Sequence, residues 1–503
     1  MGTGLPSKES QTGRDDPPDG GYTFEALVDR LLAMPMSKHD SKFAIIFLCL
    51  FRKFATPQQL LLEIVQRFDD ADQKEASGLQ KLALRLRYLN ILQQWISEYT
   101  TDFAHSNMRH LLTNFVHKLS LDSDFAIAHK EINPYLEQIG DDDEIGYEFL
   151  DKGRSRASTM ESFLSTSSTY SATSTVTAES SAEDSIEPMG LAKRSSAPST
   201  QLSETPSIDS TSEPGSSQST GSLRSFLGTL EDARHQAQFL RPFPRYHVDK
   251  IRWHQLMDIA DEHIALELTR IDWILYSSIQ PRDLLRHVSV SAGAKERCRS
   301  LEFVSGMINQ FNHVAFWVAN MILLRDKPKH RAIMMEKFLA VAWKLRYLNN
   351  YNSLGAIIAG INGTAVHRLS QTRSMVSPEA RKQFMRLEIL MGTAKSHSAY
   401  RLGWQNTSGP RIPFLPLHRR DLVSSEAGNK TFIQADDGEK INWKKFEIIG
   451  EIIVGIRESQ NLPYPAMKRN EEISRLILGG KFTKDEDVCE YDLITAINPH
   501  PNC

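Results

Sequence analysis

Residue types that could carry out catalysis or bind a metal are present in this sequence, but they are dispersed. Five histidines fall on separate predicted helices: His313, His330, His367, His397 and His418. The acidic pair Asp436 and Asp437 lies in a predicted turn. Motifs that bind phosphate or zinc, or that carry a nucleophilic serine, are absent: GxxxxGK[ST], GxGxxG after a strand, HExxH and GxSxG. We therefore expect no bond-making chemistry, no cofactor and no metal, and we favour a protein that binds and reshapes a partner.

Composition and charge argue against several other classes of protein. The 4 cysteines lie far apart without CxxC spacing, which disfavours a zinc site or a disulfide framework and favours a reducing compartment. A net charge of -3 leaves no overall footprint for nucleic acid. The longest apolar run, at residues 43–51, is far shorter than the roughly 20 residues that span a bilayer. The polar start lacks the apolar core of a signal peptide, so we expect a cytoplasmic protein.

The elements that would position a binding surface are helices throughout. In residues 22–137, Thr23 and Thr56 are predicted N-caps, and Pro57 follows Thr56 at the first helical position. In residues 239–503, apolar residues recur at steps of three and four. One predicted buried face consists of Met334, Phe338, Val341, Leu345 and Leu348. The sequence therefore predicts an all-α fold: an N-terminal helical bundle and a large C-terminal helical domain.

Two local features interrupt this helical pattern. A short β-hairpin is predicted in FIQADDGEKINW at residues 432–443, because DDG is a turn signal. Asn442 is then the predicted cap of the next helix. Residues 1–21 and 138–238 are polar, and Ser, Thr, Ala and Pro dominate the second range, so neither can bury enough apolar surface to offset its ordering entropy. We predict a disordered N-terminus and a disordered linker. Serines in RSRAS and KRSS suit a basophilic kinase acting on that linker.

One core helix carries residues that weaken it. The stretch NNYNSLGAIIAGINGTAVHRL, residues 349–369, has asparagines at both ends and glycines inside an apolar segment. Asn362 places a polar group in this apolar neighbourhood. Its side chain either caps the end of the helix or faces a partner.

The same stretch resembles a signature of the catalytic domain of Ras-family guanine nucleotide exchange factors, a Son of sevenless-like domain that reads L-N-N-F-N-x-L-x-A-I-x-x-G-L-N. Other pieces follow that domain's order: IALELTRIDWILYSSIQPRDLL, FNHVAFWVANMI, IPFLPLHRRDLVSSEAGN and SQNLPYPA. Earlier in the chain, two segments resemble the family's N-terminal Ras exchanger motif domain: FLCLFRKFATPQQLLLEIVQRF and LNILQQWISEYTTDF. The resemblance covers nearly all of the chain except its start and the linker.

The resemblance implies a function and a mechanism. Family members insert a helical hairpin beside the nucleotide site of a Ras-like small GTPase, open its switch I, grip its switch II and block its magnesium site. They prefer the nucleotide-free GTPase. By linkage, this preference weakens GDP binding by the same factor. Such a chain would be recruited to membranes where the lipidated GTPase resides, without binding the membrane itself.

The resemblance also assigns roles to individual residues. The catalytic positions would be Val423, Phe414, Glu426 and Asn362, and the GTPase-binding positions would be Ile308, Asn309, His397, His367, Leu422, Arg420 and Asn429. Val423 would be an exposed apolar wedge that approaches the magnesium site, and Phe414 would help to form the switch II pocket. Structural roles stay open for Phe414 as a core plug and for Leu422 as a core anchor.

The chain departs from the family at several positions. Family hairpins often end in two acidic residues before the glycine, whereas this chain has Glu426 followed by Ala427. Arg373 stands where tryptophan is frequent, and Arg419 and Arg420 replace an apolar or threonine pair. These changes leave open which GTPase is the partner. They also leave open an alternative function, a scaffold that binds a GTPase without releasing its nucleotide. A helical scaffold unrelated to GTPases is the third hypothesis.

Overall fold

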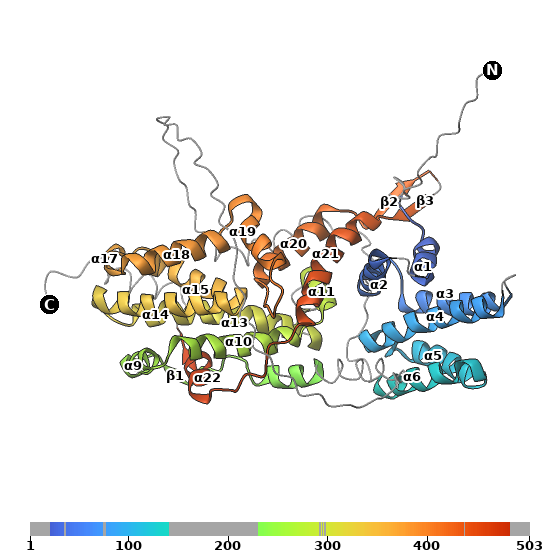
Figure 1. Cartoon of the computed structure of the whole chain (residues 1–503), viewed down its shortest axis with the longest axis horizontal. Coiled ribbons are helices and arrows are strands. Elements are labelled where there is room, and N and C mark those ends of the chain that lie inside the picture. Colours follow the sequence, from blue (N-terminus) through green and yellow to red (C-terminus); the bar gives the residue numbers. More distant parts are fainter. Residues whose placement is uncertain are drawn as a thin grey trace, which may run out of the picture.

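The computed structural model describes residues 21–34, 37–73, 77–139, 230–290, 293, 295, 298–436 and 438–482. Within these residues the fold is all-α, as predicted, with only short strands (Figure 1). Residues 1–20, most of the predicted linker and its two kinase motifs lie outside the described residues. None of the described helices is long and apolar enough to cross a membrane.

Residues 21–139 form a group of helices that we call the N-terminal group, at the right of Figure 1. Its elements are α1 (Phe24–Leu32), α2 (Lys38–Leu50), η1 (Phe51–Lys53), α3 (Pro57–Gln73), α4 (Gly78–Glu98), η2 (Thr100–Phe103), α5 (Ser106–Ser120), η3 (Ser123–Phe125) and α6 (Ala126–Gln138). The predicted caps are confirmed. The hydroxyl of Thr23 accepts a hydrogen bond from the amide of Ala26. At the start of α3, which begins at Pro57, the backbone amides of Thr56 and Gln59 each donate to the side chain of the other residue.

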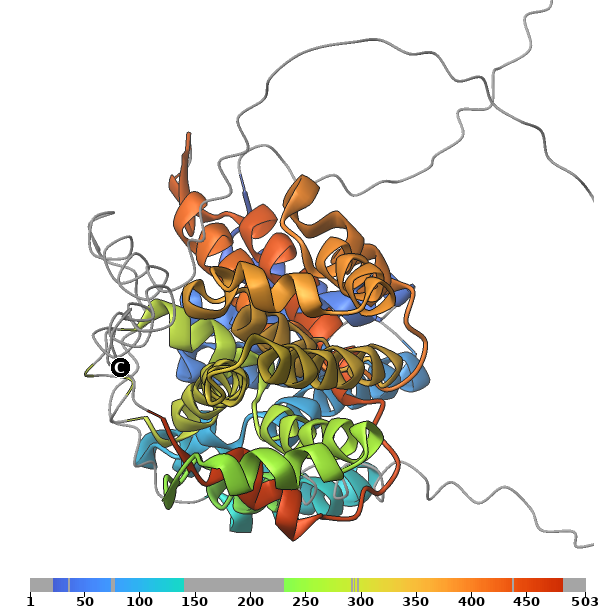
Figure 2. The same cartoon turned by 90° about the vertical axis from the view of Figure 1, so that its left-hand side faces the viewer.

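Residues 230–482 form a larger C-terminal group, whose layers are seen end-on in Figure 2. Its first half contains β1 (Tyr246–His247), α9 (Lys250–Asp258), α10 (Asp261–Ser277), α11 (Pro281–Ser289), α13 (Arg299–Leu323), α14 (Pro328–Tyr347), α15 (Tyr351–Asn362) and α16 (Thr364–His367). Its second half contains α17 (Ser370–Met375), α18 (Pro378–Met391), α19 (Ala394–Gln405), α20 (Leu415–Gly428), β2 (Phe432–Ala435), β3 (Gly438–Ile441), α21 (Trp443–Gln460), α22 (Glu471–Leu478) and β4 (Gly480–Lys481).

The β-structure joins segments that are adjacent in sequence and also segments that are far apart in it. The predicted hairpin is confirmed: β2 and β3 are antiparallel, with Phe432 opposite Ile441. Tyr22 bridges to Ile441 and so attaches the start of the N-terminal group to this hairpin. Asn442 stands at the N-cap of α21, but the predicted cap bond is wrong. The Asn442 side chain instead donates to the carbonyl of Lys430, at 3.0 Å, and this bond closes the hairpin.

The asparagines and glycines around α15 have structural causes. Asn349 adopts a φ of 54° between α14 and α15, a left-handed conformation that asparagine tolerates better than most residues. Asn350 caps α15, because its side chain accepts from the amide of Ser353. Gly360 lies where α13 crosses, and a Cβ there would come within 2.5 Å of the carbonyl oxygen of Ala315. This close crossing therefore requires glycine.

The two groups share one continuous apolar core. Aromatic rings join α2 to α21: the ring of Phe43 lies 4.6 Å from that of Trp443. A buried ion pair joins α11 to the N-terminal group, because Arg282 donates to Asp102 at 2.6 Å and also to carbonyls at the end of α2. Both contacts fix the N-terminal group against α11 and α21.

Part of the predicted linker is ordered, which corrects its boundary. Residues 230–238 are helical, with the side chains of Leu230 and Ala237 buried. Arg234 donates to the carbonyl of Ser278 at 3.2 Å and lies 3.7 Å from Asp283. The average composition of residues 138–238 did not indicate this helix. The few apolar residues at helical spacing are concentrated at the C-terminal end of that range.

Candidate functional site

Most of the predicted site residues fall on α20 or beside it. The helix begins after Phe414, and Leu415, Leu417, His418 and Leu422 are buried on one face. The opposite face exposes Arg420, Ser424 and Ala427 to solvent. Leu422 is fully buried, which fits its alternative role as a core anchor, and its assignment as a GTPase contact stays a prediction. Val423 lies between the two faces and is only partly exposed, less than the exposed valine that we expected.

Phe414 packs at the start of α20 while keeping part of its surface exposed. Its ring lies 6.0 Å from the rings of Phe311 and Tyr400. It also covers Gly355 of α15, where a Cβ would lie 2.7 Å from the ring. Phe414 therefore has the structural role that the sequence left open, and the exposed remainder of its ring is what a partner could reach.

A buried tyrosine fixes the position of Phe414, and no motif in the sequence indicated this tyrosine. The amide of Phe414 donates to the hydroxyl of Tyr400 at 2.9 Å, and this hydroxyl lies 2.8 Å from Nε2 of His418. Burial lowers the pKa of His418 to about 4, so its imidazole is neutral and the hydrogen bond joins two uncharged groups. Next to it, Arg401 pairs with Asp421 at 2.6 Å. Thus α19 holds the first half of α20.

The first turn of α19 is strained. Lys395, Ser396 and His397 have φ values of 48°, 54° and 62°, so three consecutive residues other than glycine are left-handed. This turn buries His397, whose Nε2 lies 3.4 Å from the guanidinium of Arg420. Burial and the charge of Arg420 lower the pKa of His397. His397 therefore supports Arg420 and Phe414 from behind rather than presenting its ring to solvent.

Glu426 points into the protein. Its carboxylate lies 2.9 Å from Nζ of Lys53 in the N-terminal group and 3.5 Å from Nζ of Lys445 on α21. Burial alone would raise the pKa of Glu426, but the two ammonium groups outweigh burial and lower it. The carboxylate that was assigned a catalytic role is thus engaged in a buried ion pair, and it ties the last turn of α20 to the N-terminal group.

The remaining predicted residues lie on other elements. Asn362 ends α15 and is held between Arg373 and Glu388, at 3.1 and 2.7 Å. Arg373, not Asn362, satisfies the carbonyl of Ile361 at the end of that helix. Asn309 and His367 are exposed, and Ile308 is partly buried against the core. Asn429 follows α20 and donates to the carbonyl of Ser425.

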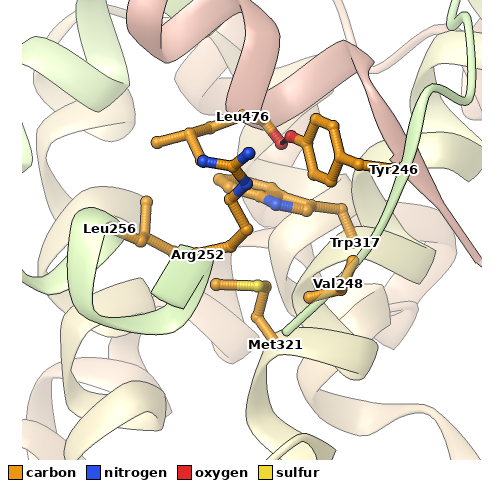
Figure 3. Close-up of a pocket in the computed structure, with 7 residues that line it drawn as sticks. All are labelled: Tyr246, Val248, Arg252, Leu256, Trp317, Met321 and Leu476. Carbon is orange, nitrogen blue, oxygen red and sulfur yellow. Dashed lines mark hydrogen bonds between the residues drawn. The ribbon is translucent and has the colours of Figure 1, made fainter. Parts of the chain in front are cut away.

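No residue of this set lines the pocket shown in Figure 3. That pocket lies between β1, α9, α13 and α22, where the guanidinium of Arg252 stacks 4.7 Å from the ring of Tyr246. Among the described residues, no three His, Cys, Asp or Glu side chains are grouped to hold a metal ion. The candidate site is therefore a protein surface around α20 and not a small-molecule cavity.

Comparisons with known proteins identify both groups of helices. The RasGEF N-terminal motif matches residues 20–117, and the RasGEF domain matches residues 263–447. Ras guanine nucleotide exchange factor A of Dictyostelium discoideum is 27% identical over 465 residues, which cover 91% of this chain and 61% of that protein. Exchange factor J of the same organism is 24% identical, over 91% of this chain and 46% of its own length.

A relative from another organism matches the C-terminal part. Rap guanine nucleotide exchange factor 5 of Homo sapiens is 31% identical over 265 residues, which cover 52% of this chain and 44% of that protein. The chain spans about half the length of the curated relatives that it matches. Both family models match in the expected order, and together they cover more than half of the chain. The chain therefore belongs to the RasGEF family.

Proposed function

We propose that this protein is a guanine nucleotide exchange factor for a Ras-like small GTPase. The observation that carries the proposal is α20, a helix anchored at both ends that leaves Val423 partly exposed beside the solvent-facing Arg420 and Ala427. The RasGEF domain match includes this helix. We assign residues 22–137 to an N-terminal Ras exchanger motif domain and residues 239–503 to the exchange domain.

The proposed mechanism is differential binding. A GTPase holds GDP through contacts to its phosphate-binding loop and a magnesium ion. A partner that binds the nucleotide-free state more tightly weakens GDP by the same factor, and GTP then enters by mass action. In this proposal α20 inserts beside the nucleotide, with Val423 excluding the hydrated ion. The Lys53–Glu426 pair lets the N-terminal group brace α20. The lipidated GTPase would bring the exchange factor to the membrane.

A second candidate is a scaffold that binds a GTPase without releasing its nucleotide. One observation favours it: Glu426, the acidic residue near the tip of α20, is already paired with Lys53 and Lys445, and Ala427 offers no carboxylate. Such a chain would bind the GTPase and leave GDP in place.

A fluorescent-GDP release assay with Ras, Rap and Ral GTPases separates the two candidates. An exchange factor accelerates release from at least one of them, whereas a scaffold binds without acceleration. Val423→Asp should abolish release, because a carboxylate would coordinate the magnesium ion instead of excluding it. Ser424→Asp places the same charge on the exposed neighbouring position and is the matched control. Circular dichroism should show that both variants are folded. A folded Val423→Asp protein with the wild-type rate would refute this assignment of the wedge.

A further inference from the structure

Arg419 on α20 is a partly buried cation that pairs with no carboxylate among the residues described in the structure. Its Nε is buried, and no acceptor bonds to that atom within the part of the chain that the structure describes. Among the same described residues, no carboxylate forms an ion pair with its guanidinium, and burial lowers its pKa. Among other partly buried arginines, Arg401 pairs with Asp421 and Arg457 with Glu98. Arg331 and Arg373 form no ion pair with any described residue, but each donates to a backbone carbonyl.

A neutral histidine lies close to Arg419. Burial and the positive charges of Lys295 and Arg419 together lower the pKa of His287 on α11 to about 3. His287 is thus an uncharged neighbour that senses the charge of Arg419 and supplies no counter-charge to it. An unpaired cation that has lost part of its hydration destabilises a fold, so its presence calls for a physical explanation.

The position of Arg419 on α20 suggests what that explanation is. Arg419 precedes Val423 by four residues, so both side chains lie on the same face of the helix, one turn apart. That face carries the residue to which we assign entry into the GTPase. Glu426, three residues beyond Val423 on this face, is already neutralised by Lys53 and Lys445. Arg419 is therefore the charged residue on this face of α20 that no carboxylate neutralises among the described residues.

We propose that Arg419 is a specificity-determining residue that binds an anionic oxygen group of the GTPase complex. This inference rests on the proposed exchange function. Guanidinium binds carboxylate and phosphate oxygens in the same two-pronged geometry, so the group is a carboxylate of the GTPase or a phosphate of its nucleotide. Docking would supply the counter-charge that Arg419 does not find among the described residues. Partners with an anion at this place would then be preferred over those without one.

The first test measures stability, and it needs no GTPase. Arg419→Met removes an unpaired charge and keeps the aliphatic stem, so the melting temperature of the full chain should stay constant or rise. Arg457→Met is the matched control, because it strands the carboxylate of Glu98, which lies 2.5 Å from the guanidinium; its melting temperature should fall. A fall in Arg419→Met as large as in the control would show that Arg419 has a structural partner, and would overturn the proposal.

The second test measures exchange on the GTPase that responds best to the wild-type chain. Arg419→Met should slow fluorescent-GDP release about tenfold, and Arg419→Lys should recover part of the loss. Binding of Arg419→Met to nucleotide-free GTPase separates the two anions: weaker binding identifies a carboxylate, and unchanged binding with slow release identifies a phosphate. An unchanged release rate in Arg419→Met, with active wild type, overturns this inference alone. A wild-type chain that accelerates release from no GTPase overturns the proposed function as well.

Discussion

The two ends of α20 are held in different ways. Its first half is anchored within the C-terminal group by α19, through the Tyr400–His418 hydrogen bond and the Arg401–Asp421 ion pair, between residues about 20 positions apart. Its last turn is anchored by Lys53, which lies 373 positions earlier in the chain, and by Lys445. The first half of α20 is thus positioned by contacts between residues close in sequence. The position of its last turn depends on how the N-terminal group packs, and this dependence couples that group to the proposed exchange surface.

The largest effect should come from breaking the distant anchor. In Lys53→Met the buried carboxylate of Glu426 keeps only the longer contact to Lys445, so the free energy of unfolding should fall by about 3 kcal/mol. Urea unfolding measures this change. Adding Glu426→Met should restore part of it, because the stranded charge is removed. Two losses that simply add would show that the pair does not couple the N-terminal group to α20.

As the pH falls, the contacts that anchor the first half of α20 should weaken at a higher pH than the ion pair that anchors its last turn. The folded pKa of His418 is about 4, below its ordinary value of 6.5, so the unfolded chain binds more protons and stability falls as the pH drops from 6.5 towards 4. At pH 5 this loss is about 2 kcal/mol. The pKa of Glu426 is lowered from 4.5, so its contribution persists until the pH falls below that value.

A variant isolates the His418 contribution from other titrations. Burial raises the pKa of Asp272 to about 6, which acts in the opposite direction between pH 6 and 4. We therefore compare wild type with His418→Gln, whose amide oxygen can still accept from Tyr400, by urea unfolding at pH 7 and pH 5. The stability advantage of wild type should shrink on acidification. A constant difference at both pH values would contradict the role given to neutral His418.

A smaller effect is expected from removing one hydroxyl. Tyr400→Phe leaves the amide of Phe414 and Nε2 of His418 without their partner, and should cost about 1 kcal/mol of stability. Amide hydrogen exchange at Phe414 should become faster. Tyr276→Phe also removes a buried hydroxyl, bonded to Ile456 and Ser459 of α21, and should leave the Phe414 amide protected. Equal protection of that amide in both variants would mean that α19 does not fix the start of α20.

The smallest predicted effect tests the left-handed turn beside this anchor. Ser396 has a φ of 54°, which glycine adopts without steric cost, so Ser396→Gly should raise stability by about 0.5 kcal/mol. Ser398 lies two residues later in the right-handed part of α19, where Ser398→Gly should lower stability by a similar amount. Thermal unfolding of both variants measures the contrast. Destabilisation by both would show that the turn at Ser396 is right-handed in solution.

The sequence by itself determined the helices, several of their caps and the family. Apolar spacing predicted that Met334, Phe338, Val341 and Leu345 are buried, because helical periodicity is a local property of the chain. The caps at Thr23 and Thr56 and the hairpin at residues 432–441 were predictable for the same reason. The motifs around α15 and α20 also placed most of the candidate residues on α20 or beside it.

Tertiary structure decided which residues of that surface are available to a partner. Glu426 looked like a free carboxylate at the tip of α20 until packing brought Lys53 to within 2.9 Å of it. Leu422 and Val423 are neighbours in sequence, yet one is fully buried and the other partly exposed. Arg419 has no counter-charge among the described residues, because its neighbour on α11, His287, is neutral. Charge pairing and burial depend on residues that are distant in sequence, so no local pattern could specify them.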